Sequence, residues 1–456
     1  MIRTESIDVE QFIEANGLSG FHGVIMALCF LVVLIEGVDI GLIAYIAPAV
    51  RHEWGFSLVE LSPVFAAALI GTAIGSFVFG PLADRFGRRP IVIASVLFFG
   101  VAAIATLFCH NVHQLALARL IGGLGFGGAG PSVVALVAEF APPKWRMQSV
   151  SVMFTGPALG SALGGLIASH LVPAYGWRSM LVLGGGVPLV LVPFLIACLP
   201  ESMYFLAVKH RNGQARIRAI AKRISKIAIG DSLVFSARQE KNQKGISIRE
   251  LFAPEFAFRT LLLWITAFAG NFGLYLLWNW LPIILTAAGG SIKAASVVTA
   301  MHSIGGVVGT LCLGYLAGRV RSQRFSLLLT GTYVVAGVMI IAVGQIYAIA
   351  SLAACTTFLV GFFLTGSNSS VNGLGALLYP TAMRATGLGC VLALGRIGAI
   401  FSTLAGSFLL STGWSYDLIF EAIALPAFVA AIGIGAMYAG TRLLPAVREG
   451  VPERVH

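Results

Sequence analysis

The sequence is short of charged residues and has no recognisable cysteine pattern. Only 11% of its 456 residues are Asp, Glu, Lys or Arg, whereas 57% are hydrophobic. This scarcity of charge excludes an ordinary water-soluble domain. The six cysteines all fall within apolar runs and show neither paired nor metal-ligating spacing. We therefore expect them to be packing residues, and we expect no bound metal.

Motifs for nucleotide binding and for enzyme catalysis are also missing. The run similar to GxGxxG, from Gly123 to Gly128, lies inside a long apolar segment, where glycines let helices pack closely. The sequence therefore predicts neither a cofactor nor an enzyme. The net charge of +11 would suit nucleic acid, but the basic residues lie in short loops between apolar runs. That distribution follows the positive-inside rule of membrane proteins and argues against a nucleic-acid partner.

The chain contains many apolar runs long enough to cross a bilayer, which takes about 20 residues. They recur along the whole length and predict an all-α integral membrane protein with twelve transmembrane helices. A long polar stretch after the sixth run predicts two pseudo-symmetric six-helix bundles, residues 1–200 and 259–456, joined by a cytoplasmic central loop at 201–258. The predicted spans are 23–48, 61–82, 90–109, 112–140, 148–172, 178–200, 259–287, 293–317, 325–344, 347–378, 386–411 and 416–441.

The positions of Lys and Arg predict the orientation in the membrane. With the N-terminus in the cytoplasm, 25 of the 30 basic residues fall on the cytoplasmic side. Three fall on the outer side, namely Arg51, Arg178 and Lys293, and two lie within spans. Because cytoplasmic loops carry the excess of positive charge, both termini are predicted to be cytoplasmic.

Two acids stand near the middle of the first span, in the run Glu36-Gly-Val-Asp39. Three residues apart on a helix, they share one face. An ionised carboxylate at the bilayer centre costs about 2.5–3.5 kcal/mol on insertion scales, so it is kept where it faces protein or water. We interpret the pair as a proton or ion site. The alternative is a structural acid paired with a cation on another helix.

Two arginines lie within predicted spans. Arg396 lies deep in the eleventh span, and its planar guanidinium matches a carboxylate with two parallel hydrogen bonds. We favour it as the anchor for a substrate carboxylate, with a permanent ion pair to Glu36 or Asp39 as the alternative. Arg119 lies in the outer part of the fourth span. It needs a partner or water, unless it snorkels to the outer interface.

Polar and aromatic side chains inside the spans are candidates for contact with a substrate. Those of the seventh span form one stripe, which predicts a face toward a central cavity where aromatic groups could stack on a ring. Hydrogen bonding between helices is the alternative for this stripe, and a satisfied structural role is the alternative for the histidine. The candidates are Asn271, Tyr275, Trp278, Asn279, His302, Asn368 and Asn372.

The two halves carry related loops after the second and eighth spans. The first reads Gly80-Pro-Leu-Ala-Asp84-Arg-Phe-Gly87-Arg-Arg89, and the second has Gly318 in place of the acid. Repeated halves with a site between them are typical of secondary transporters. In the first loop a glycine allows a tight turn, and the acid can cap a neighbouring helix. The residues expected to form a gate are Gly80, Asp84, Arg85, Gly87, Arg88 and Arg89.

With twelve spans in a 6+6 arrangement and a GxxxDRxGRR loop, the chain resembles the major facilitator superfamily over nearly its whole length. The acid pair, Leu199-Pro-Glu-Ser202, Tyr379–Gly387 and Gly395-Arg-Ile-Gly398 are similar to motifs of its aromatic acid:proton symporter family. That family usually shows Asp-Gly-x-Asp in the first span, so Glu36 is a departure, one also tolerated in phenylpropionate-type members. The resemblance implies alternating access, a part for Arg119 in proton coupling, and a gating loop that latches the outward-open state.

We therefore predict a proton-coupled importer of small aromatic carboxylates, such as hydroxybenzoate- or phenylpropionate-type acids, in a bacterial inner membrane. We expect a monomer whose partners are the substrate, protons and membrane lipid. The substrate class rests on the resemblance, because the residues alone indicate an organic anion site with an acid pair.

Three alternatives remain open. Gly156-Pro-Ala-Leu-Gly160 partly resembles an antiporter signature, so an exporter of drugs or metabolites is one. A symporter of a non-aromatic anion and a non-transporting sensor are the others. The basic amphipathic pattern Arg216–Ile224 is expected at the cytoplasmic face, against helix ends or anionic lipid.

Overall fold

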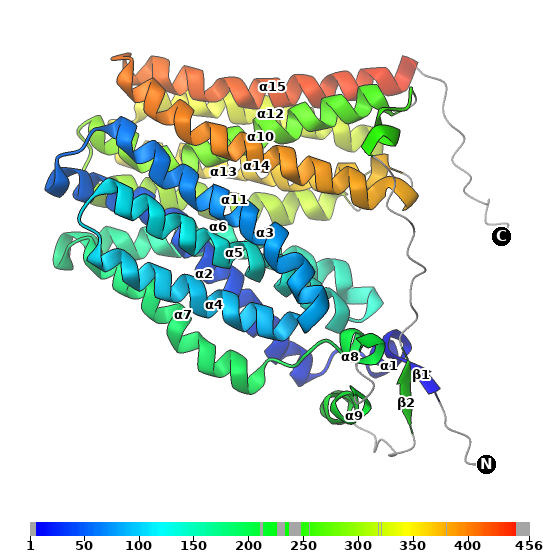
Figure 1. Ribbon diagram of the computed structural model, residues 1–456. Coiled ribbons are helices and arrows are strands. Elements are labelled where there is room, and N and C mark those ends of the chain that lie inside the picture. The colour runs from blue at the N-terminus through cyan, green and yellow to red at the C-terminus, as the bar shows by residue number, and fades with distance from the viewer. Residues whose placement is uncertain are drawn as a thin grey trace, which may run out of the picture.

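The computed structural model describes residues 6–209, 213–225, 233–236, 248–254, 256–317, 319–320, 322–379 and 381–443. Within these residues, twelve helices are long and apolar enough to cross a membrane, which confirms the predicted fold class. They run side by side along one direction (Figure 1). The twelve helices are α2 (Gly20–Trp54), α3 (Ser62–Phe86), α4 (Arg88–Ala105), α5 (Val112–Phe140), α6 (Pro143–Tyr175), α7 (Arg178–Cys198), α10 (Ala257–Ala287), α11 (Ile292–Ala317), α12 (Ser322–Ile346), α13 (Ala350–Leu378), α14 (Thr381–Ser411) and α15 (Tyr416–Leu443).

Local signals fix the helix ends, and most lie within a few residues of the predicted boundaries. Helix α2 extends past the predicted span 23–48 at both ends. At its start, the backbone N–H of Ser19 donates to Nδ1 of His22 at 3.1 Å, forming half of a capping box. At its end, Gly55 adopts φ 69° and its N–H donates to the Arg51 carbonyl at 2.9 Å. This left-handed turn suits glycine and stops the helix.

The two six-helix halves pack their helices in the same pattern. In the first half, α2 packs on α6, α3 on α5, and α4 on α7. In the second half the equivalent pairs are α10 with α14, α11 with α13, and α12 with α15. Each half is therefore a bundle with the same arrangement of helices, and the two bundles lie one above the other in Figure 1. The division at residues 200 and 258 remains a prediction.

Glycines allow the closest approaches within the first bundle. A Cβ atom on Gly37 would overlap the backbone of Pro157, and one on Gly160 would overlap the Leu34 carbonyl. Because only glycine leaves this space, α2 and α6 touch backbone to backbone. The Gly156–Gly160 run thus has a packing role between these two helices.

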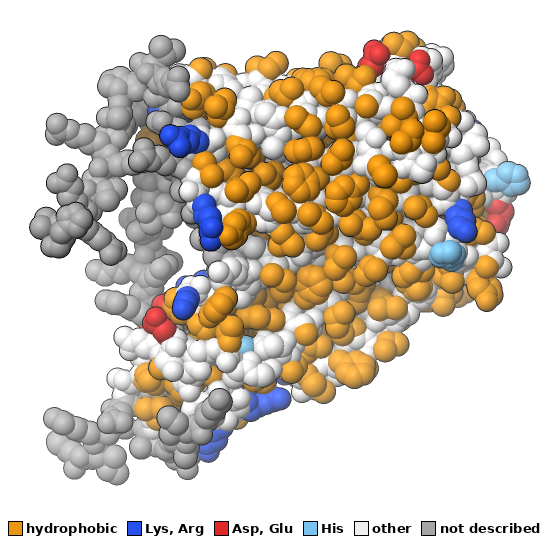
Figure 2. All heavy atoms as spheres, turned by 180° about the vertical axis from the view of Figure 1, so that it is seen from behind, with side chains coloured by type: hydrophobic (Ala, Val, Ile, Leu, Met, Phe, Trp, Pro, Cys, Tyr) orange, Lys and Arg blue, Asp and Glu red, His pale blue; other side chains and the backbone are white. Residues whose placement is uncertain are grey.

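The two ends of the molecule differ. We call the end at which α2 begins and α15 ends the basic end, because most described Lys and Arg residues of the loops lie there. Figure 2 shows hydrophobic side chains over the flanks and charged side chains gathered near the two ends. The exposed flank residues include Phe77, Phe194 and Ile432, at 81%, 57% and 70% exposure. This distribution fits a bilayer around the middle of the helices.

The bundles meet toward the end opposite the basic end. Near that end, Ser62 of α3 donates to the Thr403 carbonyl of α14 at 3.0 Å, and the rings of Phe65 and Trp280 lie 5.5 Å apart. Further in, Ser303 of α11 bonds to Ser161 of α6 at 3.3 Å. Toward the basic end α3 and α14 diverge (Figure 1). Among the described residues the structure is therefore closed at the end opposite the basic end.

A small layer, which we call the cap, covers the basic end of the first bundle. Strand β1 pairs in parallel with β2, with Ser6 opposite Val234, and Phe12 packs edge-on against Phe235 at 5.2 Å. The buried face of α9 includes Ile217, which joins the same apolar cluster as the start of α2. The remaining elements are β1 (Ser6–Asp8), α1 (Val9–Asn16), α8 (Met203–Lys209), α9 (Gly213–Ile224), β2 (Val234–Ser236), and the 3-10 helices η1 (Leu58–Leu61), η2 (Thr106–Phe108) and η3 (Ile248–Phe252).

Candidate functional site: a charged cavity between the bundles

The acid pair of α2 faces Arg119 of α5. The guanidinium donates from Nη1 to Oδ1 of Asp39 and from Nη2 to Oδ2, each at 2.7 Å, and Nη2 also reaches the Asp39 carbonyl at 3.2 Å. The side chains are 8% and 4% exposed, respectively. A guanidinium and a carboxylate bind most strongly when two parallel hydrogen bonds join them, as they do here. Arg119 therefore has a partner inside the bundle and does not snorkel to an interface.

Glu36 lies one helical turn from Asp39 and has different surroundings. Its carboxylate faces Gly130 of α5, where an added Cβ would lie 3.4 Å from Oε2. Among the described residues it has no hydrogen bond and no ion pair, although it interacts electrostatically with Arg396 and Asp39. The site thus holds one carboxylate paired with a cation and one with no hydrogen-bond or ion-pair partner among the described residues.

A small cavity joins these groups to the second bundle. Its volume is about 60 Å³, enough for a few water molecules and too small for an aromatic acid. Residues from α2, α3, α5 and α10 line it, so both bundles contribute. The lining residues are Glu36, Asp39, Ile40, Ile43, Val64, Phe65, Ala68, Leu69, Thr72, Arg119, Phe126, Tyr275 and Asn279.

Arg396 of α14 is not among the residues that line this cavity, but it is close enough for its charge to act on two of them, and its guanidinium makes few contacts with described residues. Its Nη1 donates to Oγ of Ser76 on α3 at 3.1 Å, which is a contact between the bundles. The side chain is exposed, and its charge acts on both Glu36 and Tyr275. The ion pair with Glu36 or Asp39 that the sequence left open is not formed here. Most of the guanidinium donors therefore remain available to a ligand.

The polar stripe of α10 divides between two environments. Tyr275 and Asn279 line the cavity, while Trp278 packs edge-on against Tyr275 at 5.3 Å. Asn271 exchanges hydrogen bonds with Asn368 of α13 at 3.4 and 3.3 Å. The stripe therefore provides both of the roles considered for it, cavity lining and interhelical bonding. The side chain of Asn372 lies outside the described part of the chain.

His302 lies away from the central cavity. It is 0% exposed, and its neighbours are apolar side chains of the second bundle, including Leu277, Ile340 and Phe420. Neither ring nitrogen has a hydrogen-bond partner among the described residues. The structure thus places this candidate inside the second bundle and does not bring it to the site. A lone histidine in an apolar run gives no signal of the direction in which it points.

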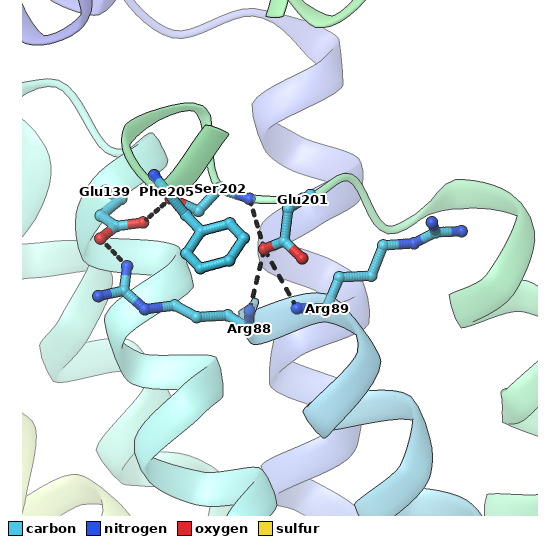
Figure 3. Close-up of polar contacts among 6 residues, drawn as sticks. All are labelled: Arg88, Arg89, Glu139, Glu201, Ser202 and Phe205. Atoms are coloured by element: carbon cyan, nitrogen blue, oxygen red, sulfur yellow. Dashed lines mark hydrogen bonds and ion pairs between the residues drawn. The ribbon is translucent and has the colours of Figure 1, made fainter. Parts of the chain in front are cut away.

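The loop between α3 and α4 forms a network at the basic end (Figure 3). Oε1 of Glu201 accepts from the backbone N–H groups of Arg88 at 3.0 Å and Arg89 at 3.3 Å, so this carboxylate caps the start of α4. Gly87, at φ 107°, makes the turn, and a Cβ there would collide with Glu201. The capping acid comes from the segment after α7, within the motif Leu199-Pro-Glu-Ser202, for which no capping role was predicted.

Glu139 at the end of α5 ties the network together. It forms an ion pair with the Arg88 guanidinium and accepts a hydrogen bond from the Ser202 hydroxyl. That hydroxyl also accepts from the N–H of Phe205 at 3.0 Å. Sequence reasoning missed Glu139, although an acid in the last turn of an apolar span was an available signal.

The remaining loop residues lie at the surface. Asp84 and Arg85 are exposed, and Asp84 interacts favourably with the charge of Arg88. Gly80 is partly exposed and has open space around it, so no close helix approach involves it in this state. Gly87, Arg88 and Arg89 are loop residues whose contacts join the start of α4 to its neighbours.

Comparison with known proteins decides the family. A family model described as Major Facilitator Superfamily matches residues 29–403. The chain belongs to this superfamily. The chain is 36% identical to the gallate transporter of Pseudomonas putida, over 97% of each chain. It is 37% identical to the 4-hydroxybenzoate transporter PcaK of the same organism, over 94% of this chain and 95% of that one.

Further comparisons agree with this result. The 3-(3-hydroxy-phenyl)propionate transporter of Escherichia coli K12 is 33% identical over 85% of this chain and 87% of its own. A solved bacterial homologue of the human lysosomal transporter Spinster superposes with a TM-score of 0.65 at 14% identity. The superposition covers 94% of this chain and 100% of the Spinster homologue, and it supports the assignment of the fold. The protein is thus a transporter of the major facilitator superfamily that is related to aromatic acid transporters, and it is not an enzyme.

Proposed function

We propose that the protein is a proton-coupled importer of a small aromatic carboxylate, working by alternating access in a bacterial inner membrane with both termini in the cytoplasm. The observation that carries this proposal is the Arg396 guanidinium, which makes one hydrogen bond to a described residue and acts electrostatically on the unpaired carboxylate of Glu36 in the central cavity. This arrangement offers an anion site and a proton site next to each other. The named cargoes of the relatives support the aromatic class.

Arg396 is the proposed carboxylate anchor. Both terminal nitrogens of Arg119 already donate hydrogen bonds to Asp39. Arg396 donates one hydrogen bond, to the hydroxyl of Ser76. A guanidinium with free donors can take both oxygens of a carboxylate. Tyr275 and Asn279 from the facing helix α10 would then contact the ring and its substituents.

Glu36, Asp39 and Arg119 form the proposed proton-coupling unit. An anion entering against an inside-negative potential is opposed by roughly 2.3 kcal/mol per charge per 100 mV. One proton carried with it cancels that charge, and the pH gradient then drives accumulation. Glu36 can take a proton without breaking a hydrogen bond to any described residue, whereas protonation of Asp39 would weaken its bond to Arg119. Release of Arg119 would couple protonation to a movement of α2 against α5.

The gating loop is proposed to control which side is open. In the described residues, α4, α5 and the segment after α7 are joined at the basic end by Arg88, Glu139 and Glu201. This network lies within the first bundle, so it holds that bundle rigid while the bundles rock. Asp84, exposed at the same end, would contact the second bundle once that end closes.

Uptake into proteoliposomes tests the proposal. Radiolabelled 4-hydroxybenzoate should accumulate when the outside is acidic and should leave when the gradient is reversed, with benzamide as the uncharged control. Accumulation driven by an acidic interior would instead favour the exporter. Absence of counterflow with every aromatic acid tried would refute transport of this class and favour a different anion or a sensor.

A further inference from the structure

A second, larger cavity opens at the end opposite the basic end. Its volume is about 470 Å³, within the usual range for small-molecule sites. One wall comes from the end of α2 and from η1, and the other comes from α10. The lining residues are Ala47, Pro48, Arg51, His52, Gly55, Phe56, Leu61, Ile283, Thr286 and Ala287. Because the walls belong to different bundles, rocking of the bundles must change its shape.

Two uncommitted basic side chains line this cavity. Neither Arg51 nor His52 has a side-chain hydrogen bond or ion pair with a described residue. The neighbouring Arg178 differs, since it pairs with Glu53 at 2.8 Å and stacks on Trp177 at 4.3 Å. The nearby acid is thus already occupied, and Arg51 remains available to an anion.

The rest of the lining suits the body of an aromatic acid. Phe56, Leu61 and Ile283 are buried and provide an apolar wall. A cationic rim beside an apolar wall matches a ligand with a carboxylate at one end and a ring at the other.

The cavity lies directly above the central site along α2. Ile43 lines the central cavity and Ala47 lines the outer one, so the two are about one helical turn, roughly 6 Å, apart. Phe65, which lines the central cavity, packs on Trp280 across the bundle interface. Movement of the two bundles apart at this contact would open the central cavity toward the outer one.

We propose that this cavity is an outer vestibule, in which Arg51 captures the carboxylate of the aromatic acid before the molecule moves to Arg396. The inference rests on the proposed function and adds a second binding site to it. Capture by a fixed cation raises the local concentration of an anion and speeds its entry, most strongly at low salt. The vestibule is the first site met by molecules arriving from this end and the last one passed by molecules leaving through it.

The test compares Arg51→Gln with Lys293→Gln. Both substitutions remove one positive charge from the same end of the molecule, but only Arg51 lines the vestibule. Initial uptake rates of 4-hydroxybenzoate are measured in vesicles of both orientations, at low and high salt, with the amount of folded transporter determined by gel filtration. Arg51→Gln should raise the apparent KM for entry from the vestibule side about fivefold, with an unchanged maximal rate.

The salt dependence and the form of the loss distinguish capture from a structural effect. Because no net flux occurs at equilibrium, the ratio of maximal rate to KM must fall by the same factor whether substrate is supplied from the vestibule side or from the basic end. High salt should narrow the difference in KM between Arg51→Gln and the wild type. Equal KM values for Arg51→Gln, Lys293→Gln and wild type would overturn the vestibule, as would a rise in KM that high salt does not reduce. A wild type that moves no aromatic acid would refute the proposed function, and the vestibule with it.

Discussion

The carboxylate of Asp39 and the guanidinium of Arg119 form a two-pronged ion pair, with both N–O distances at 2.7 Å. This pair crosses from α2 to α5 inside the first bundle, and almost none of it is exposed. Breaking a buried pair by removal of one partner typically costs about 3–5 kcal/mol, because the other charge is left without compensation. The pair is therefore a structural tie as well as a candidate proton site.

Asp39→Asn should abolish uphill accumulation, because an amide cannot carry the proton, and should also lower thermal stability, since Arg119 loses its charged partner. The double variant Asp39→Asn with Arg119→Gln removes the uncompensated charge. It should recover much of the stability without recovering accumulation. Melting temperature and proton-driven uptake measured on the same samples separate the two effects. Normal uphill uptake by the single variant would end the coupling role of Asp39.

Glu36→Gln should lose proton-driven accumulation at little cost in stability. The side chain has no hydrogen bond to break among the described residues, and the amide is of nearly the same size. Counterflow, which needs no net proton movement, should continue. We would measure both activities together with the pH dependence of uptake between pH 5.5 and 8.5. If accumulation persists with its wild-type pH dependence, Glu36 is not a proton carrier.

Arg396→Lys keeps the charge but loses the planar fork, so binding of the acid should weaken by roughly tenfold while activity remains measurable. Arg396→Ala should remove most of the preference for the acid over its neutral amide. Ser76→Ala serves as the control, because it removes the hydroxyl partner of Arg396 and leaves the cation in place. Calorimetric titration with the acid and the amide gives the affinities. If Arg396→Ala binds the acid with unchanged affinity, Arg396 is not the carboxylate anchor and Arg119 becomes the next candidate.

Asp84→Asn should slow turnover without a large change in substrate affinity. The residue is exposed at the basic end, far along α3 from the cavity, so it can act on the populations of the two states but not on the ligand. Transport assays give the turnover rate, and a direct binding assay gives the affinity for the substrate. A large loss of affinity at normal turnover would contradict gating.

Glu201→Gln should destabilise the start of α4, because the carboxylate that accepts from two backbone N–H groups becomes a neutral amide. Loss of the charge at a helix N-terminus should cost about 1 kcal/mol. The melting temperature should fall, and amide exchange at Arg88 and Arg89 should speed up. Glu250→Gln, an exposed change outside this network, is the matched control. Equal melting temperatures for both variants would argue against the cap.

Hydropathy was enough to predict the twelve helices, because a bilayer demands about 20 apolar residues wherever the chain crosses it. The long polar stretch after the sixth run and the related loops of the two halves predicted the two bundles. Hydropathy also singled out Glu36, Asp39 and Arg396, since charges inside apolar runs are costly. Hydropathy could not predict which of these charged residues form ion pairs with one another. Asp39 meets Arg119 only because α2 packs beside α5, and that adjacency depends on how the bundle closes.

Other features carried weaker signals. Trp278 and His302 lie in spans that also contribute to the cavity or the bundle interface, but which way each side chain points is decided by small rotations of packed helices. Glu139 and Glu201 form a network only because the end of α5 and the segment after α7 lie together at the basic end. The vestibule is built from both bundles, so no local stretch of sequence encodes it.

The pairing of β1 with β2 has a consequence for the order in which the protein is made. Ser6 leaves the ribosome early, but its partner Val234 follows only after all six helices of the first bundle have been synthesised. The strand pair cannot form until that stage of translation. Completion of the cap therefore requires the part of the chain that forms the first bundle, and it requires none of the helices from α10 onward.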